Sequence, residues 1–69
     1  MQLFPRQLAP VALLTALPGT GLRRGQVGTV VEPLDEEMVL VEFSDDDGRA
    51  YAVTPCQRKD LLILHYAPE

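Results

Sequence analysis

The chain has little of what stabilises or equips many small proteins. It contains one cysteine, no tryptophan and only 6% aromatic residues. A lone cysteine cannot form an intramolecular disulfide, which excludes the disulfide-stapled scaffolds that are common among small secreted domains. We therefore expect a reducing, cytoplasmic setting.

Long apolar runs are missing as well. No run reaches the ~20 apolar residues that a membrane-spanning helix needs, and we expect no membrane association. Arg6 precedes an apolar stretch from Leu8 to Leu17 in the manner of a short signal peptide, but Pro10 interrupts it. Cleavage near Ala16 would leave about fifty residues, a size at which folding without disulfides is marginal. We interpret the stretch as part of the fold.

Basic charge is scarce. Ten acidic residues against six basic ones give a formal net charge of -4 and a pI near 4.7. Binding to nucleic acid depends mainly on lysine and arginine side chains that neutralise phosphates, so this balance argues against a nucleic-acid partner. A nucleic-acid-binding barrel is kept as the alternative function, and it would use Arg23, Arg24 and Arg49, with Arg58 and Lys59 beside them.

The chain does have enough apolar residues for a core. Hydrophobic residues make up 46% and charged residues 23% of its 69 residues, which predicts one small folded domain over residues 1–69. Turn-forming residues divide it into five segments that are too short for typical helices and rich in strand-forming residues. These segments are Val11–Thr15, Gln26–Val31, Met38–Phe43, Arg49–Thr54 and Leu61–Tyr66.

Two segments predict which side chains face the core. In the third, alternation places Val39, Val41 and Phe43 inward. In the second, Val27 and Val30 both look like core residues although they are three positions apart. A β-bulge at Gly28 would bring both to one face.

Connections between the segments complete the expected fold. Asp47-Gly48 between two strand-like segments predicts an antiparallel hairpin, and the stretch from Pro55 to Asp60 suits one turn of 3₁₀ helix. The expected fold class is all-β: a small SH3-like, partly open barrel of about five antiparallel strands with a short 3₁₀ turn before the last strand. A competing interpretation makes Pro10–Leu17 a two-turn helix.

Four sequence stretches resemble a known family. They are GLRRGQVGTVVE from Gly21, VEF from Val41, DGRAYA from Asp47 and DLL from Asp60. Together they resemble a family of short bacterial domains of unknown function with an SH3-like barrel, over about Leu8 to His65. Looser similarity reaches the small barrels of photosystem I accessory subunits and of the nitrile hydratase β-subunit type. The resemblance implies the barrel and a cytoplasmic setting, supplies no catalytic residues, and implies an antitoxin or immunity role through neighbouring toxin-like genes.

Candidate catalytic and metal-binding residues are few. Arg58 and Lys59 could lower the thiol pKa of Cys56, and a cysteine enzyme would rest on Cys56 and the single histidine, His65. One cysteine and one histidine fall short of the three or four ligands of zinc. The three aspartates before Gly48 lack the spacing of a calcium loop. We expect no enzyme activity, no cofactor and no metal site, and interpret Cys56 as a partly buried small hydrophobe.

Binding to another protein is the function that the sequence favours. Five short strands cannot hide every large side chain in one core, and open barrel edges can add a strand from a peptide or a second copy. We expect a non-enzymatic interaction module, antitoxin- or immunity-like or an accessory subunit, with a protein partner or a homo-oligomer formed through the barrel edge. The candidate partner-binding residues are Arg23, Arg24, Met38, Leu40, Tyr51 and Tyr66.

Overall fold

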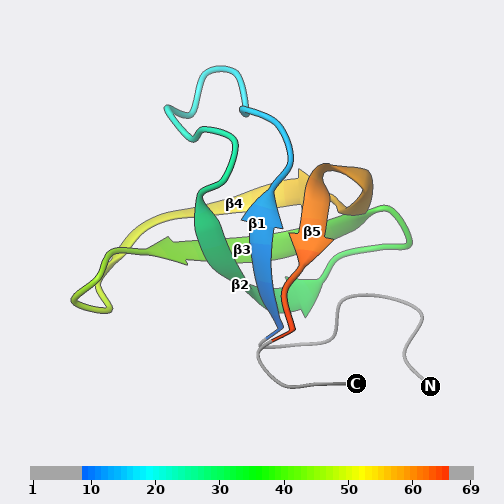
Figure 1. Ribbon diagram of the computed structural model, residues 1–69. Helices are drawn as coiled ribbons and strands as arrows, with labels where there is room; N and C mark the ends of the chain where they lie inside the picture. Colours follow the sequence, from blue (N-terminus) through cyan, green and yellow to red (C-terminus); the bar gives the residue numbers. More distant parts are fainter. Residues whose placement is uncertain (1–8, 66–69) are drawn as a thin grey trace.

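The computed structural model describes residues 9–65, and within them the fold is all-β (Figure 1). This confirms the expected class, with five strands and a single 3₁₀ turn before the last strand. No helix in the described part of the chain is long and apolar enough to cross a membrane. The elements are β1 (Pro10–Leu13), β2 (Val27–Pro33), β3 (Met38–Ser44), β4 (Ala50–Gln57), η1 (Arg58–Asp60) and β5 (Leu61–Ile63).

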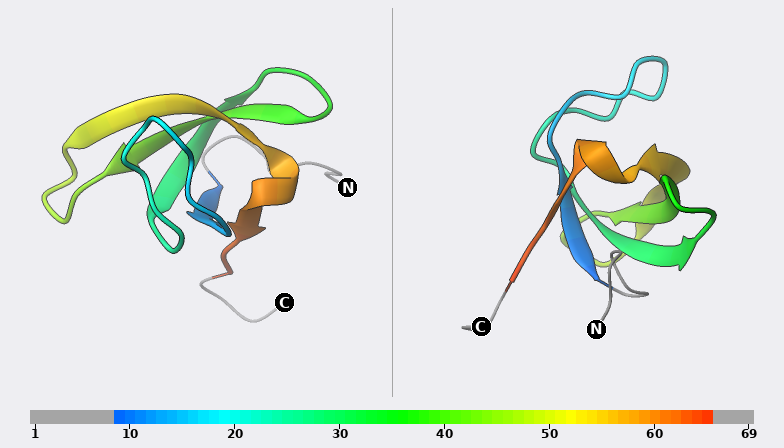
Figure 2. Two further views of the ribbon diagram at one scale, coloured as in Figure 1. Left: turned by 90° about the horizontal axis from the view of Figure 1, so that it is seen from above. Right: turned by 90° about the vertical axis from the view of Figure 1, so that its right-hand side faces the viewer.

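All five strands belong to one antiparallel sheet. Their order across the sheet is β4-β3-β2-β1-β5, so β1, the first strand along the chain, lies between β2 and the last strand. The sheet is strongly curved, and β3 and β4 cross the direction of β1 and β5 (Figures 1 and 2). The sheet is not closed, because β4 and β5 remain its two edges.

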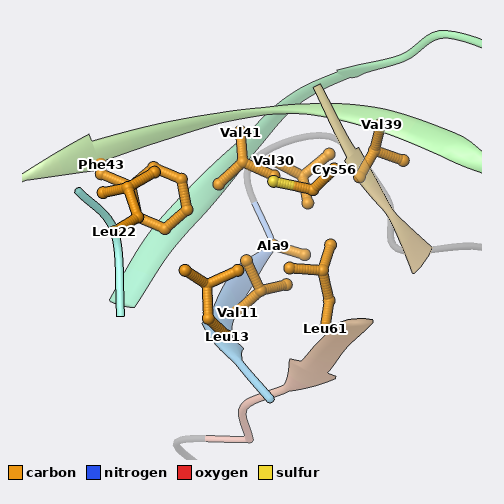
Figure 3. Close-up of a cluster of buried hydrophobic side chains, with 10 residues drawn as sticks. All are labelled: Ala9, Val11, Leu13, Leu22, Val30, Val39, Val41, Phe43, Cys56 and Leu61. Atoms are coloured by element: carbon orange, nitrogen blue, oxygen red, sulfur yellow. The ribbon is translucent and has the colours of Figure 1, made fainter. Parts of the chain in front are cut away.

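The curved sheet encloses the core on its inner face. Val39, Val41 and Phe43 are fully buried there, as the alternation in β3 predicted. Figure 3 shows their side chains opposite those of β1 and β5. The complete set of buried residues is Ala9, Val11, Leu13, Leu22, Val30, Val39, Val41, Phe43, Cys56 and Leu61.

The prediction for β2 was right for Val30 as a core residue and wrong for Val27 and for a bulge at Gly28. Val27 is 46% exposed and Val30 is fully buried, so the two do not share a face. The register shift lies between Val30 and Glu32, not at Gly28. Gly28 itself faces the core, where an added Cβ would lie 2.9 Å from Cδ1 of Phe43. The Phe43 ring fills the space that a side chain at position 28 would need, so ordinary alternation over residues 28 and 30 is sufficient.

The helical interpretation of Pro10–Leu17 is also wrong. Residues 10–13 form β1 between β2 and β5, and burial of Val11 and Leu13 in the core outweighs the helix propensity of alanine and leucine. Leu17 lies beyond β1 and forms an isolated bridge with Leu22.

β4 is longer at its C-terminal end than predicted. It continues to Gln57, and η1 covers only Arg58–Asp60. Pro55 lies within β4 opposite Leu40. An edge strand tolerates this proline because one side of its backbone has no strand to bond to.

The hairpin between β3 and β4 is confirmed. Asp45 N–H donates to the carbonyl of Arg49 and Gly48 N–H donates to the carbonyl of Asp45, at 2.9 and 3.0 Å. Gly48 has a φ of 80°, the left-handed conformation that a three-residue hairpin loop requires at this position. The chain reversal therefore follows from the Asp-Gly pair that predicted it.

Candidate protein-interaction surface

The outer face of β1 and β5 consists of apolar side chains. Ala12 lies opposite Val27 on one side and Leu62 on the other, so these three residues form one row across the sheet. The chain is apolar without interruption over 10–14 and over 61–64. We call the following set the apolar outer face: Pro10, Ala12, Leu14, Val27, Leu62 and Leu64.

The larger members of this set are well exposed. Leu62 is 50% exposed, and Val27 and Leu14 are each 46% exposed. The backbone N–H of Leu64 donates to Pro10 and that of Leu14 donates to Asp60, so the antiparallel β1–β5 alignment continues beyond the paired strand residues. The positions of the apolar outer face are therefore held by the same backbone pairing as the core.

The outer face of β3 has a different composition. Met38, Leu40, Glu42 and Ser44 alternate with the buried residues, and all four are half-buried. Glu42 lies between Thr29 and Val53, so polar and apolar groups mix. Antiparallel sheets with one solvated face normally alternate in this way, whereas strands covered on both faces are apolar throughout. β1 and β5 have the pattern of covered strands.

Acidic side chains gather in the two turns at the ends of β3. Oδ1 of Asp35 accepts hydrogen bonds from the backbone N–H groups of Glu37 and Met38. Oδ1 of Asp45 does the same for Asp47 and Arg49. The acidic residues of the two turns are Asp35, Glu36, Glu37, Asp45, Asp46 and Asp47. β1 and β5 themselves contain no charged residue.

The structure places the predicted partner-binding residues in separate regions. Arg23 and Arg24 are exposed in the connection between β1 and β2, and Met38 and Leu40 lie half-buried on β3. Tyr51 is 50% exposed on β4. Tyr66 lies outside the described residues.

One pair of these regions is linked. Gln26 Nε2 donates to the hydroxyl of Tyr51 at 2.9 Å, and Gln26 Oε1 accepts from the backbone N–H of Arg23. This contact spans β3, because β3 lies between β2 and β4. The structure thus joins Tyr51 to the loop that carries Arg23, and leaves Met38 and Leu40 apart from them on the outer face of β3.

Cys56 is a core residue of β4 and is 1% exposed. Burial, and secondarily the negative charge of Asp60, raises the pKa of its thiol above the ordinary 9.0. The thiol donates to the carbonyl of Thr54 at 3.7 Å. The suggestion that Arg58 and Lys59 lower this pKa was wrong, because burial and the charge of Asp60 raise it. His65 is exposed beyond β5.

Within residues 9–65, no three histidine, cysteine or acidic side chains are grouped so that they could hold a metal ion. Asp45 uses one carboxylate oxygen to close its own turn. A shallow groove beside η1 is lined by Glu37, Gln57, Arg58 and Lys59, where the N–H of Arg58 donates to the carbonyl of Glu37.

The sequence reasoning missed Leu14, Val27 and Leu62 as surface residues. Val27 was assigned to the core, and the other two were not singled out. The available signal was the lack of any polar residue over 10–14 and 61–64, because a strand with one solvated face should contain one at every second position.

A comparison with protein families identifies the family to which the chain belongs. The family DUF4926, a domain of unknown function, matches residues 8–63. The chain belongs to this family. The match covers β1 to β5 and every residue of the apolar outer face except Leu64. Comparisons with curated proteins and with solved structures gave no match.

Proposed function

We propose that this DUF4926 protein is a non-enzymatic protein-interaction module, and that another protein chain covers its apolar outer face. The observation that carries the proposal is the apolar composition of β1 and β5 on both faces, with Leu62 and Val27 about half exposed in one row. Fully burying a leucine or valine side chain contributes about 1.5–3 kcal/mol. Completing the burial of these residues contributes roughly half of that for each.

The charge distribution supports the same surface. The six acidic residues of the two turns lie at the ends of β3, while β1 and β5 are uncharged. Interfaces typically have an apolar centre with a polar rim. An antitoxin- or immunity-like protein or an accessory subunit would use such a surface, and the single cysteine suits a reducing cytoplasm.

A matched pair of charge substitutions tests the proposal. Leu62→Lys places a charge in the apolar outer face, and Val53→Lys makes the same kind of change at a residue of β4 that is 54% exposed. Protein complexes are crosslinked in cells and isolated through each tagged variant, with circular dichroism as the control for folding. We expect Leu62→Lys to lose complexes that Val53→Lys retains, because the buried lysine would have no partner charge.

Two outcomes contradict the proposal. One is that both folded variants retain the same complexes as the wild type. The other is that the wild type forms no complex, with itself or with another protein.

A further inference from the structure

We propose that a second copy of the chain pairs with the free edge of β5, antiparallel and around a two-fold axis at Ile63. This inference rests on the proposed function, since it names a second copy as the chain that binds beside the apolar outer face, at the free edge of β5. The copies would form one continuous sheet through their β5 strands.

The hydrogen-bond pattern shows which backbone groups of β5 point to its free edge. Leu64 N–H donates to the carbonyl of Pro10, and Leu14 N–H donates to the carbonyl of Asp60. In an antiparallel ladder every second residue bonds to the same neighbour. Residues 60, 62 and 64 therefore direct their backbone groups towards β1, and residues 61 and 63 direct theirs away from it.

Ile63 is the residue of β5 that presents both backbone groups to the free edge. The N–H of Leu61 already bonds to the carbonyl of Arg58. The N–H and the carbonyl of Ile63 point away from β1, and within residues 9–65 β5 pairs with no other strand. Two copies related by a two-fold axis at Ile63 would exchange a reciprocal pair of hydrogen bonds, N–H of each to the carbonyl of the other.

The same register extends the apolar outer face across the contact. With Ile63 opposite Ile63 of the second copy, Leu62 lies opposite Leu64 of the second copy. Leu64 in turn lies opposite Leu62 of the second copy. Leu62 is 50% exposed and Leu64 is half-buried in the single chain. Directly opposed apolar side chains stabilise strand pairing, so the contact buries side chains as well as satisfying the edge.

The other edge of the sheet is less suited to this pairing. Arg58 N–H donates to the carbonyl of Glu37. Because every second residue bonds to the same neighbour, residues 39 and 41 of β3 also bond to β4. Residues 53 and 55 of β4, which lie opposite the intervening residues of β3, direct their backbone groups outward. Pro55 has no N–H to offer there. Proline on an edge strand is a recognised protection against strand addition, and β5 has no such residue.

Charge favours the same edge. Each copy has a net charge of -4, so two copies repel each other least when uncharged surfaces meet. Residues 61–64 are uncharged, and the acidic turn over residues 45–47 joins β3 to β4 at the opposite edge of the sheet. The turn over residues 35–37 lies beside η1, where the N–H of Arg58 donates to the carbonyl of Glu37. Pairing through β5 brings uncharged strands together.

The first test is the oligomeric state of matched proline variants. Sedimentation equilibrium of the full chain up to about 1 mM should show a monomer–dimer equilibrium. Ile63→Pro removes the N–H at the two-fold axis but leaves the bonds from β5 to β1, and should weaken dimerisation about tenfold or more. Val53→Pro makes the equivalent change at the edge of β4 and should leave dimerisation unchanged.

A second test remains decisive if a proline variant does not fold. Opposed residues that exchange both hydrogen bonds have Cα atoms about 5.5 Å apart, within the usual disulfide range. Ile63→Cys should therefore form a covalent dimer under mild oxidation, and Val53→Cys should not. Cys56 is buried and present in both variants.

The inference is overturned if the wild type remains monomeric at the highest concentration, or if Ile63→Cys crosslinks no better than Val53→Cys. If it fails while Leu62→Lys still loses a different protein that Val53→Lys retains, the proposed function stands and another chain occupies the surface. If Leu62→Lys and Val53→Lys behave alike, the proposed function fails.

Discussion

Gly28 lies on β2 against β3, and its lack of a side chain is required by packing. A Cβ there would lie 2.7 Å from Cγ1 of Val41 and 2.8 Å from the carbonyl oxygen of Glu42. Both distances are shorter than ordinary van der Waals contact, and the carbonyl belongs to the backbone of the paired strand. The position therefore constrains how β2 and β3 approach each other.

We predict that Gly28→Ala destabilises the fold by about 1–3 kcal/mol. The free energy of unfolding from urea titrations measures this. In a Val41→Ala background the cost of Gly28→Ala should fall, because Cγ1 is gone, but part should remain because the Glu42 carbonyl is still there. Equal stability of Gly28→Ala and wild type would contradict the close packing.

Cys56 makes stability depend on pH in the alkaline range. Its folded-state pKa is raised above 9.0, mainly by burial. The unfolded thiol therefore ionises at lower pH than the folded one, so the unfolded state binds fewer protons above pH 9.0. Stability falls as pH rises where the unfolded state binds fewer protons.

We predict a constant Cys56 contribution below that pH and a progressive loss above it. Urea unfolding of the wild type and of Cys56→Ala across this range provides the comparison. The wild type should lose more stability than Cys56→Ala as pH increases, and the native thiol should resist alkylation at neutral pH. Parallel pH profiles, or fast alkylation of the folded protein, would show that the thiol is accessible.

At the scale of elements, each turn at an end of β3 is closed by one aspartate. Asp45 Oδ1 accepts from the N–H groups of Asp47 and Arg49 at 2.9 and 3.0 Å, and Asp35 Oδ1 accepts in the same way from Glu37 and Met38 at 2.8 Å. Aspartate favours turns for this reason. These hydrogen bonds close the turns that connect β3 to β2 and to β4.

We predict that Asp45→Ala costs about 1–2 kcal/mol of stability, because two backbone donors lose a charged acceptor. Asp46→Ala is the matched control, since Asp46 lies in the same acidic run and its carboxylate accepts no hydrogen bond from the described residues. Urea unfolding should show little change for Asp46→Ala. A similar loss for both would point to general charge effects in place of the hydrogen bonds.

β1 and β5 show why an element can be recognised while its surroundings are misjudged. Their apolar residues predicted strands, and the inner positions Val11, Leu13 and Leu61 are buried as core residues. The register with β2 was needed to show that Ala12, Val27 and Leu62 share the opposite face. Periodicity within one strand cannot supply register between strands.

At the scale of the whole molecule, charge makes nucleic-acid binding the less favoured of the two proposals. Arg23 and Arg24 are exposed, but the net charge is -4 and Arg49 closes the turn that holds Asp45, Asp46 and Asp47. Phosphate binding needs a basic surface. The acidic side chains of that turn reduce the positive potential around Arg49.

We predict no complex with single-stranded RNA or double-stranded DNA in a gel-shift titration at physiological salt. The doubly substituted Arg23→Ala/Arg24→Ala protein serves as the reference for residual binding at low salt. Binding by the wild type that weakens steeply with salt and disappears in this double variant would favour the nucleic-acid alternative.

The sequence by itself determined the all-β class, the hairpin at Asp45–Gly48 and the inward face of β3. Each depends on neighbours along the chain: turn chemistry, strand propensity and alternation. The full length of β4 could not be predicted without the order of strands in the sheet. Pro55 is tolerated within this strand only because β4 lies at an edge.

Only the tertiary structure determined which apolar residues are exposed together on one face. The exposure of Val27, the need for glycine at position 28 and the row from Leu62 through Ala12 to Val27 all arise from pairing between strands far apart in the sequence. β1 and β5 are separated by most of the chain and lie side by side in the sheet. The single cysteine and the few aromatic and basic residues narrowed the class of protein. The location of the apolar outer face depended on which strands pair in the sheet and in which register.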